Sequence, residues 1–328
     1  MAAPPEVSEA IVDSGPVPLA VRDHGGDGPP VLLIHGAGGN LLAWEGFAPQ
    51  LTETHRVVAL DLRGHGRPGD GPWSWAEVLD DLEVVIERLA LDAPAVVGHS
   101  MGGMLAAMWA RRHPDCPAVV SLDGHRSAET YARNYAGMPP EQVIQDLAAL
   151  KKLFDTQARQ MAQPLTEAMV DMLLEQQRAA ALAIGADPDR AAATMKRGLR
   201  VDDDGNTWWR PSAATSATLR DLPEFKDCLP VFAEVTSPFL VVLATRILPG
   251  VPPQLAPLLD ALRTGLRRDL GALAARNPQL RVQEFDASHG MVFEEPAAVA
   301  AVVGEFLQAY APAADPAGKP VEVGDGQG

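Results

Sequence analysis

The sequence is poor in basic residues and has no long hydrophobic run. It contains 27 Lys and Arg against 43 Asp and Glu, a formal net charge of −16 over 328 residues. This acidic excess is spread along the chain, so nucleic-acid backbones and anionic membranes are unfavourable partners. No apolar run approaches the ~20 residues of a transmembrane helix, and the N-terminus lacks the basic-then-apolar pattern of a secretory signal. We therefore expect a cytoplasmic protein that binds neither nucleic acid nor membrane.

Cysteine is also scarce, and the common metal and nucleotide motifs are missing. Cys116 and Cys228 form no CxxC pair and are expected to be free thiols in a reducing compartment. The histidines show no HExxH or paired spacing, so no metal is expected. GxGxxG and GxxxxGK[ST] loops are absent, so no cofactor is expected. Hydrophobic residues nevertheless make up 47% of the chain, enough for a sizeable core.

Short apolar strand patterns alternate with helical patterns along most of the chain. The predicted strands cover residues 31–34, 57–60, 95–97, 118–120, 239–244 and 280–285. The predicted helices among them cover residues 75–91, 101–112, 255–275 and 296–310. A strand–helix–strand order at this spacing implies parallel pairing with right-handed crossovers. The sequence thus predicts an α/β fold with a mostly parallel, twisted sheet flanked by helices.

The alternation breaks in the middle of the chain, where helical patterns dominate. The predicted helices there cover residues 140–154, 166–184 and 188–197, followed by a short hairpin. A helical block inserted into a parallel sheet is a lid or cap. We therefore expect a first core part at 1–124, a helical cap at 125–235, a second core part at 236–311 and a disordered tail at 312–328.

The strongest chemical signal is the GHSMGG motif at residues 98–103, between a predicted strand and a predicted helix. A tight strand-to-helix turn forces its serine, Ser100, into a strained conformation, and small flanking residues let the turn close. The hydroxyl then stands at the carboxyl edge of the sheet, under the positive end of a helix. A simple N-cap serine is the alternative, but a cap does not need glycine on both sides. We predict that Ser100 is a nucleophile.

A serine hydroxyl needs a base and a site for the charge that develops on the substrate. His289, in the DASHG loop after the last predicted strand, ends at the same edge of the sheet as Ser100. We predict that His289 is the base. The HGAGG turn after the first buried strand can supply the backbone amide of Ala37 to an oxyanion, and Met101, next to Ser100, can supply the other.

Together these motifs resemble the cap-bearing, esterase-like serine hydrolases of the α/β-hydrolase superfamily. The resemblance rests on the HGAGG turn at His35, the DLRGHG loop at 61–66, the GHSMGG elbow and the terminal His289. With the strand order it covers residues 17–311, the cap by its position only. It implies the α/β-hydrolase fold and a structural role for Asp61 and His65, whose loop usually shapes the site.

The acid of the triad departs from the usual pattern of that superfamily. In most members it follows the penultimate strand, here residues 239–244, but the next six residues, TRILPG, contain no carboxylate. Asp123 ends the strand before it, at the same edge of the sheet, where some members carry their acid. Asp123 could instead cap the first turn of the lid or form an Asx turn, and Asp286 is a further candidate. We predict that Asp123 is the acid.

A serine at the elbow favours acyl transfer to water over attack by a carboxylate. We predict a serine hydrolase of carboxylesterase or lactonase type that forms an acyl-enzyme. The methionines and tryptophans of the cap suggest a bulky, largely apolar small-molecule substrate, and His35, Trp208 and Trp209 are candidate substrate-binding residues. The alternatives are a C–C bond hydrolase, an acyltransferase or cyclase, and a ligand-binding or signalling protein with little turnover.

Overall fold

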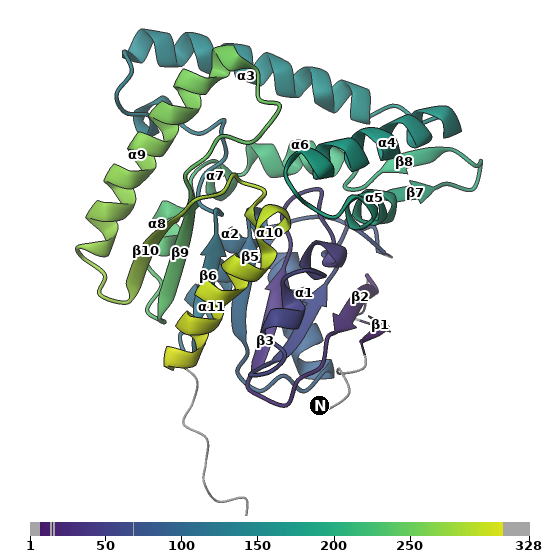
Figure 1. Ribbon diagram of the computed structural model, residues 1–328, viewed down its shortest axis with the longest axis vertical. Coiled ribbons are helices and arrows are strands. Elements are labelled where there is room, and N and C mark those ends of the chain that lie inside the picture. The colour runs from purple at the N-terminus through teal and green to yellow at the C-terminus, as the bar shows by residue number, and fades with distance from the viewer. Residues whose placement is uncertain (1–6, 14, 16, 68, 311–328) are drawn as a thin grey trace, which may run out of the picture.

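An eight-stranded sheet forms the centre of the fold in a computed structural model that describes residues 7–13, 15, 17–67 and 69–310 (Figure 1). The tail expected at 312–328 therefore lies outside the described residues. The strand order is β1-β2-β4-β3-β5-β6-β9-β10. All neighbours from β4 to β10 pair in parallel, whereas β1 and β2 are antiparallel additions at one edge. The predicted α/β fold with a mostly parallel sheet is confirmed.

The elements follow the predicted alternation. The strands are β1 (Ser8–Val12), β2 (Leu19–Asp23), β3 (Pro30–Ile34), β4 (Arg56–Leu60), β5 (Ala95–His99), β6 (Val119–Leu122), β7 (Leu199–Val201), β8 (Thr207–Trp209), β9 (Phe239–Ala244) and β10 (Leu280–Phe285). The α-helices are α1 (Trp75–Arg88), α2 (Met101–Arg112), α3 (Pro140–Met161), α4 (Glu167–Ala183), α5 (Pro188–Arg197), α6 (Ala213–Asp221), α7 (Pro223–Lys226), α8 (Leu229–Phe232), α9 (Ala256–Ala274), α10 (Met291–Glu294) and α11 (Pro296–Tyr310). Short 3₁₀ turns lie at η1 (Leu41–Trp44), η2 (Ala48–Gln50), η3 (Ala132–Asn134) and η4 (Pro253–Leu255).

The sheet separates two hydrophobic clusters, which explains why its central strands are apolar throughout. Along β3, Leu32 and Ile34 point into a cluster with α1, α2, α8 and α9, whereas Val31 and Leu33 point into a cluster with η1, η2, α10 and α11. Because successive side chains of a strand point to opposite faces, a strand covered on both sides reads as a continuous apolar run. Among the described helices, none combines the length and hydrophobicity needed to cross a bilayer.

Between β6 and β9 the chain forms helices α3 to α8 and the hairpin β7–β8. Figure 1 shows α3 across one end of the molecule and α4, α5 and the hairpin beside it. The chain leaves and re-enters the core at one place, because Ser127 N–H donates to the Phe225 carbonyl over 3.1 Å and Cys228 N–H donates to the His125 carbonyl over 2.9 Å. The three helices predicted in this segment are present as α3, α4 and α5, with α3 extending further to Met161.

Candidate active site

Ser100 lies in a sharp turn between β5 and α2. Its backbone has φ 55° and ψ −122°, a positive-φ conformation that is costly for a residue with a side chain. The turn closes because its neighbours lack a Cβ. A Cβ on Gly98 would lie 1.9 Å from the Gly102 carbonyl oxygen, and a Cβ on Gly102 would lie 2.0 Å from that of Ile34. Within the described residues the Ser100 hydroxyl makes no N-cap hydrogen bond, so the simple capping alternative does not apply.

Three side chains from three strand ends form one hydrogen-bonded chain. Ser100 follows β5, Asp123 follows β6 and His289 follows β10. Nδ1 of His289 lies 2.7 Å from Oδ2 of Asp123, and Nε2 of His289 lies 3.0 Å from Oγ of Ser100. An ionised carboxylate can only accept, so Nδ1 carries the imidazole proton and Nε2 accepts from the hydroxyl. The structure thus brings together the residues predicted as nucleophile, base and acid.

Asp123 is anchored by more than His289. Its Oδ1 accepts from the Ala244 N–H over 3.0 Å and from Nε2 of His125 over 3.1 Å. Ala244 is the last residue of β9, so the strand that lacks an acid contributes a backbone donor instead. Burial alone would raise the pKa of Asp123, but the attraction and hydrogen bond of His125 and the hydrogen bond of His289 hold that pKa well below its ordinary value. The carboxylate is therefore charged at neutral pH.

His289 is oriented through both its ring and its backbone. Burial opposes charging of the ring, but the hydrogen bond and charge of Asp123 outweigh it and raise the pKa of His289 above 6.5. Nε2–H of His99 donates to the His289 carbonyl over 2.7 Å, and the Ser288 N–H donates to Glu294 over 3.0 Å. Because 43% of the His289 side chain is exposed, the base remains accessible to a molecule from solvent.

Two free backbone amides adjoin the nucleophile. The backbone at Gly36 packs against Ser100, since a Cβ there would lie 2.9 Å from the Ser100 Cβ. Among the described residues, neither the Ala37 N–H of this turn nor the Met101 N–H donates to a protein acceptor. Both amides predicted for an oxyanion are therefore available as donors.

The DLRGHG loop packs against the HGAGG turn and the segment that follows it. Oδ1 of Asp61 accepts from the Leu41 N–H over 2.8 Å, and its Oδ2 accepts from Nε of Arg197 on α5 over 2.9 Å. Burial raises the pKa of Asp61 in spite of the Arg197 charge. His65 is fully buried, with Nδ1 3.0 Å from the Arg63 carbonyl oxygen. Asp61 and His65 thus have structural contacts, as the resemblance implied.

His35 has a structural role in place of the substrate contact that the sequence suggested. Its side chain is completely buried. The Leu62 N–H donates to its Nε2 over 3.0 Å, so Nδ1 carries the proton and donates to the Gly36 carbonyl over 2.8 Å. Both ring nitrogens are engaged inside the protein, so the ring holds the HGAGG turn against the DLRGHG loop.

Two further groups of candidates lie away from the triad. Trp208 and Trp209 belong to β8, in a hairpin at the periphery that Figure 1 shows far from α10 and the adjoining His289 loop. The Trp208 indole N–H donates to Asp202 in the same hairpin over 2.7 Å. Asp286, the alternative acid, is 90% exposed and faces Arg246 at 3.5 Å. The structure therefore does not bring these residues to Ser100.

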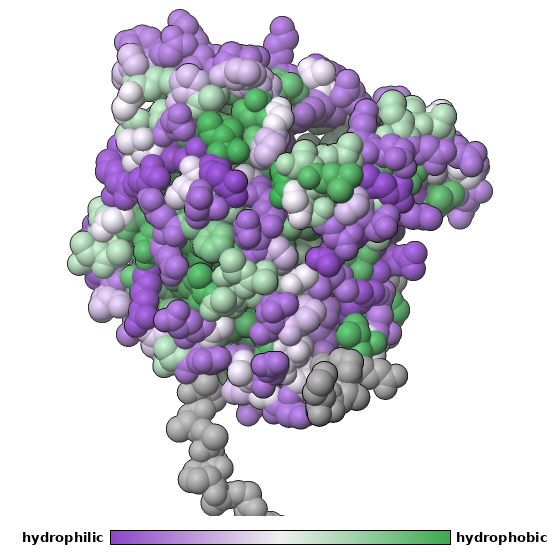
Figure 2. All heavy atoms as spheres, viewed as in Figure 1, coloured by the Kyte–Doolittle hydropathy of each residue, from purple (hydrophilic) through white to green (hydrophobic). Residues whose placement is uncertain are grey.

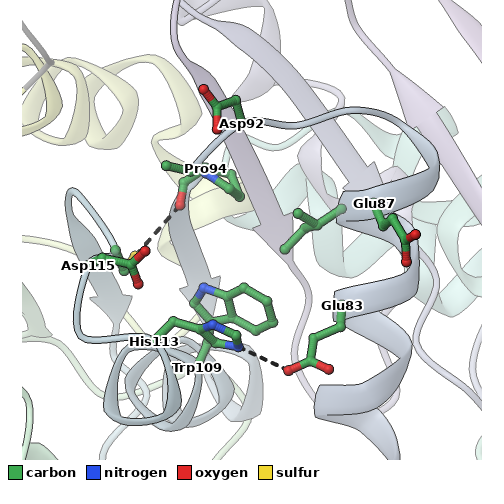
Figure 3. Close-up of a pocket in the computed structure, with 10 residues that line it drawn as sticks. Glu83, Glu87, Asp92, Pro94, Trp109, His113 and Asp115 are labelled. Atoms are coloured by element: carbon green, nitrogen blue, oxygen red, sulfur yellow. Dashed lines mark hydrogen bonds and ion pairs between the residues drawn. The ribbon is translucent and has the colours of Figure 1, made fainter.

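A surface pocket between α1 and α2 is separate from the triad (Figure 3). Its floor contains Trp109, on which the His113 ring stacks with 3.8 Å between centroids. Nε2 of His113 lies 3.1 Å from Glu83, and Glu87, Asp92 and Asp115 add further carboxylates to the rim. These residues contribute no nucleophile–base pair.

Sequence reasoning missed two histidines and a glutamate that contact the triad residues or the loop that carries them. His99 lies inside the elbow motif, His125 two residues after Asp123, and Glu294 five residues after His289. Proximity in sequence to a predicted site residue was the only signal available. A histidine beside a strand end can point in several directions, so this signal is weak without coordinates.

Sequence comparisons support the fold. A family model described as alpha/beta hydrolase fold matches residues 29–198. The lipase LipV of Mycobacterium tuberculosis is 28% identical over 305 residues, which cover 89% of this chain and 98% of that protein. An uncharacterized protein of the same organism is 37% identical over 105 residues, but this match covers only 30% of either chain.

Solved structures show the same architecture. The crystal structure of E-2-(acetamidomethylene)succinate hydrolase superimposes with a TM-score of 0.63, over 92% of this chain and 100% of that chain, at 23% sequence identity. At this level of identity the likeness concerns the fold. The matched family model, the sheet order and the strained turn at Ser100 lead to one assignment: the chain belongs to the alpha/beta hydrolase family.

Proposed function

We propose that this chain is a serine hydrolase that cleaves an ester-type bond, in a carboxylester or a lactone. The observation that carries the proposal is the hydrogen-bonded chain from Ser100 through His289 to Asp123, with distances of 3.0 and 2.7 Å. A hydroxyl that can pass its proton to a neutral, oriented imidazole is an activated nucleophile. The similarity to the lipase LipV supports the same class of reaction.

In the proposed reaction, Oγ of Ser100 attacks the substrate carbonyl carbon while Nε2 of His289 takes the hydroxyl proton. The oxyanion that forms accepts hydrogen bonds from the amides of Ala37 and Met101. His289 returns the proton to the leaving oxygen as the C–O bond breaks, which leaves an acyl group on Ser100. Water then repeats the sequence with the same base and releases the acid. Asp123 stays ionised and stabilises the imidazolium.

We also propose that residues 125–235 act as the cap over this site and select the substrate. In support, Figure 1 shows α3 and α4 beyond one end of the sheet. The proposed cap exposes apolar side chains, with Met172 51% and Leu182 66% exposed. Figure 2 shows apolar patches among hydrophilic residues on one face of the molecule. This apolar content is the basis for proposing a small-molecule substrate with a bulky apolar acyl or alcohol group. A cytoplasmic location remains a prediction from the sequence.

The test is covalent labelling with a small fluorophosphonate, read out by intact mass. We expect a single adduct on the wild-type protein and none on the Ser100→Ala variant. That result would justify screening p-nitrophenyl esters, thioesters and lactones. Folded wild-type protein that takes up no probe would contradict the proposal and favour a ligand-binding protein with little turnover.

A further inference from the structure

His125 stands where the chain leaves the core for the cap, and its ring has one defined orientation. The residue is buried, with 6% of its surface exposed. The Arg126 N–H donates to Nδ1 of His125 over 2.7 Å. Because Nδ1 accepts, Nε2 carries a ring proton, and it lies 3.1 Å from Oδ1 of Asp123. His125 is therefore a donor to the carboxylate oxygen that does not contact His289.

The backbone around His125 is held firmly enough to keep this donor in place. The His125 carbonyl accepts from the Cys228 N–H over 2.9 Å. The guanidinium of Arg126 is buried, and two carboxylates, those of Asp227 and Asp269, each bind it at 2.7 Å. Asp269 lies on α9, whereas Asp227 and Cys228 lie near the end of segment 125–235, so the backbone at His125 and Arg126 is held by two separate parts of the chain.

The two oxygens of the Asp123 carboxylate have different partners. Its Oδ2 faces His289, while its Oδ1 is fixed by Ala244 N–H and by His125. Without His125, Oδ1 would keep the Ala244 N–H as its donor, and His289 would remain at Oδ2. We propose that His125 is a positioning residue, which holds the Asp123 carboxylate in the plane that orients His289. This inference rests on the proposed serine-hydrolase function.

The competing role for His125 is purely structural, because its Nδ1 also holds the Arg126 backbone. Two substitutions separate the roles. His125→Asn keeps an acceptor near the Nδ1 position but removes the donor to Asp123. His125→Gln keeps an N–H donor near the Nε2 position but loses the acceptor for the Arg126 N–H.

We would measure fluorophosphonate labelling rates and, on any ester that is turned over, kcat and KM for both variants. A hydrogen bond to a charged group is worth about 1.5–3 kcal/mol, so we expect His125→Asn to lower the labelling rate and kcat about 10- to 100-fold with KM unchanged. His125→Gln should stay within a few-fold of wild type. If His125→Gln is labelled slowly while His125→Asn is labelled at the wild-type rate, the proposal is overturned in favour of the structural role. Wild-type rates in both variants would overturn it as well.

A double substitution tests whether His125 acts through Asp123. Once Asp123→Ala has removed the carboxylate, adding His125→Asn should cause no further loss of labelling, whereas additive losses would contradict the proposal. A readout independent of activity is the NMR signal of the His289 Nδ1–H, which should exchange faster with water in His125→Asn than in wild type. An unchanged exchange rate would count against positioning. Failure of wild-type labelling would instead refute the proposed function, so the two failures are distinguishable.

Discussion

Three buried histidines should make the folded protein sensitive to mild acid. His35, His65 and His99 are 0%, 0% and 8% exposed. Burial lowers their pKa values to about 4, about 3 and about 4, respectively, from 6.5. The folded protein therefore keeps all three neutral at a pH at which the unfolded chain has already bound protons.

The sign and size of the effect follow from this difference. Since the unfolded state binds more protons, stability is full above pH 6.5 and is lost as the pH falls towards the folded pKa values. At 1.36 kcal/mol per pKa unit, each histidine costs about 2 kcal/mol at pH 5 relative to pH 8, so the three together cost about 6 kcal/mol if they titrate independently. His289 opposes part of this loss because its pKa is raised. A typical stability is about 5–15 kcal/mol, so the loss is large.

Urea unfolding at pH 8 and pH 5, followed by tryptophan fluorescence, measures this loss as a fall in the transition midpoint. His65→Asn is a matched variant, because the Asn amide can still donate to the Arg63 carbonyl but does not titrate. The difference between the two pH values should shrink by about 2 kcal/mol in that variant. Equal midpoints at both pH values for the wild type would refute the argument.

Further predictions concern the triad residues and Arg126, which lies where segment 125–235 begins. Ser100→Ala and His289→Ala should each remove nearly all ester turnover with unchanged circular dichroism, and turnover close to the wild-type rate would contradict their roles. Asp123→Asn should lower kcat by orders of magnitude, about 10⁴-fold in the general Ser-His-Asp template; an unchanged rate would mean that another group is the acid. The wild-type kcat/KM should rise with pH through a midpoint above 6.5, because His289 must be neutral to act and Asp123 raises its pKa. Arg126→Met should destabilise the fold by about 3 kcal/mol, since it leaves two carboxylates without their shared cation, and an unchanged melting temperature would argue against this.

The sequence predicts the elements whose patterns are strong and misses those whose patterns are weak. The fully buried strands β5 and β9 lie within a few residues of their predicted bounds, because a strand covered on both faces has an unbroken apolar run. The edge strand β1 was missed because four of its five residues are exposed. Helices α6, α7 and α8 were missed too. The last two are one turn each, too short for helical periodicity to appear.

Some residues of the candidate site could likewise be predicted from the sequence, whereas others could not. Ser100, His289 and Asp123 could be placed from sequence because strand ends at one edge of a parallel sheet converge. The contacts of His125 and His99 could not, since they depend on the direction of single side chains in loops. The burial of His35 could not be foreseen either, because a histidine next to a glycine turn can face solvent or the core with equal ease.

The paired ends of segment 125–235 have a consequence for how this protein could diversify. A backbone hydrogen bond joins Ser127 to Phe225, and another joins Cys228 to His125. A loop whose ends already meet adds little closure entropy when it is lengthened, about 0.6 kcal/mol for each doubling. Whole helices between these anchor points could be exchanged, removed or inserted while the sheet keeps its register. With the proposed role of this segment in substrate selection, exchange of the insertion would change substrate preference and leave the strand ends that carry Ser100, Asp123 and His289 unchanged.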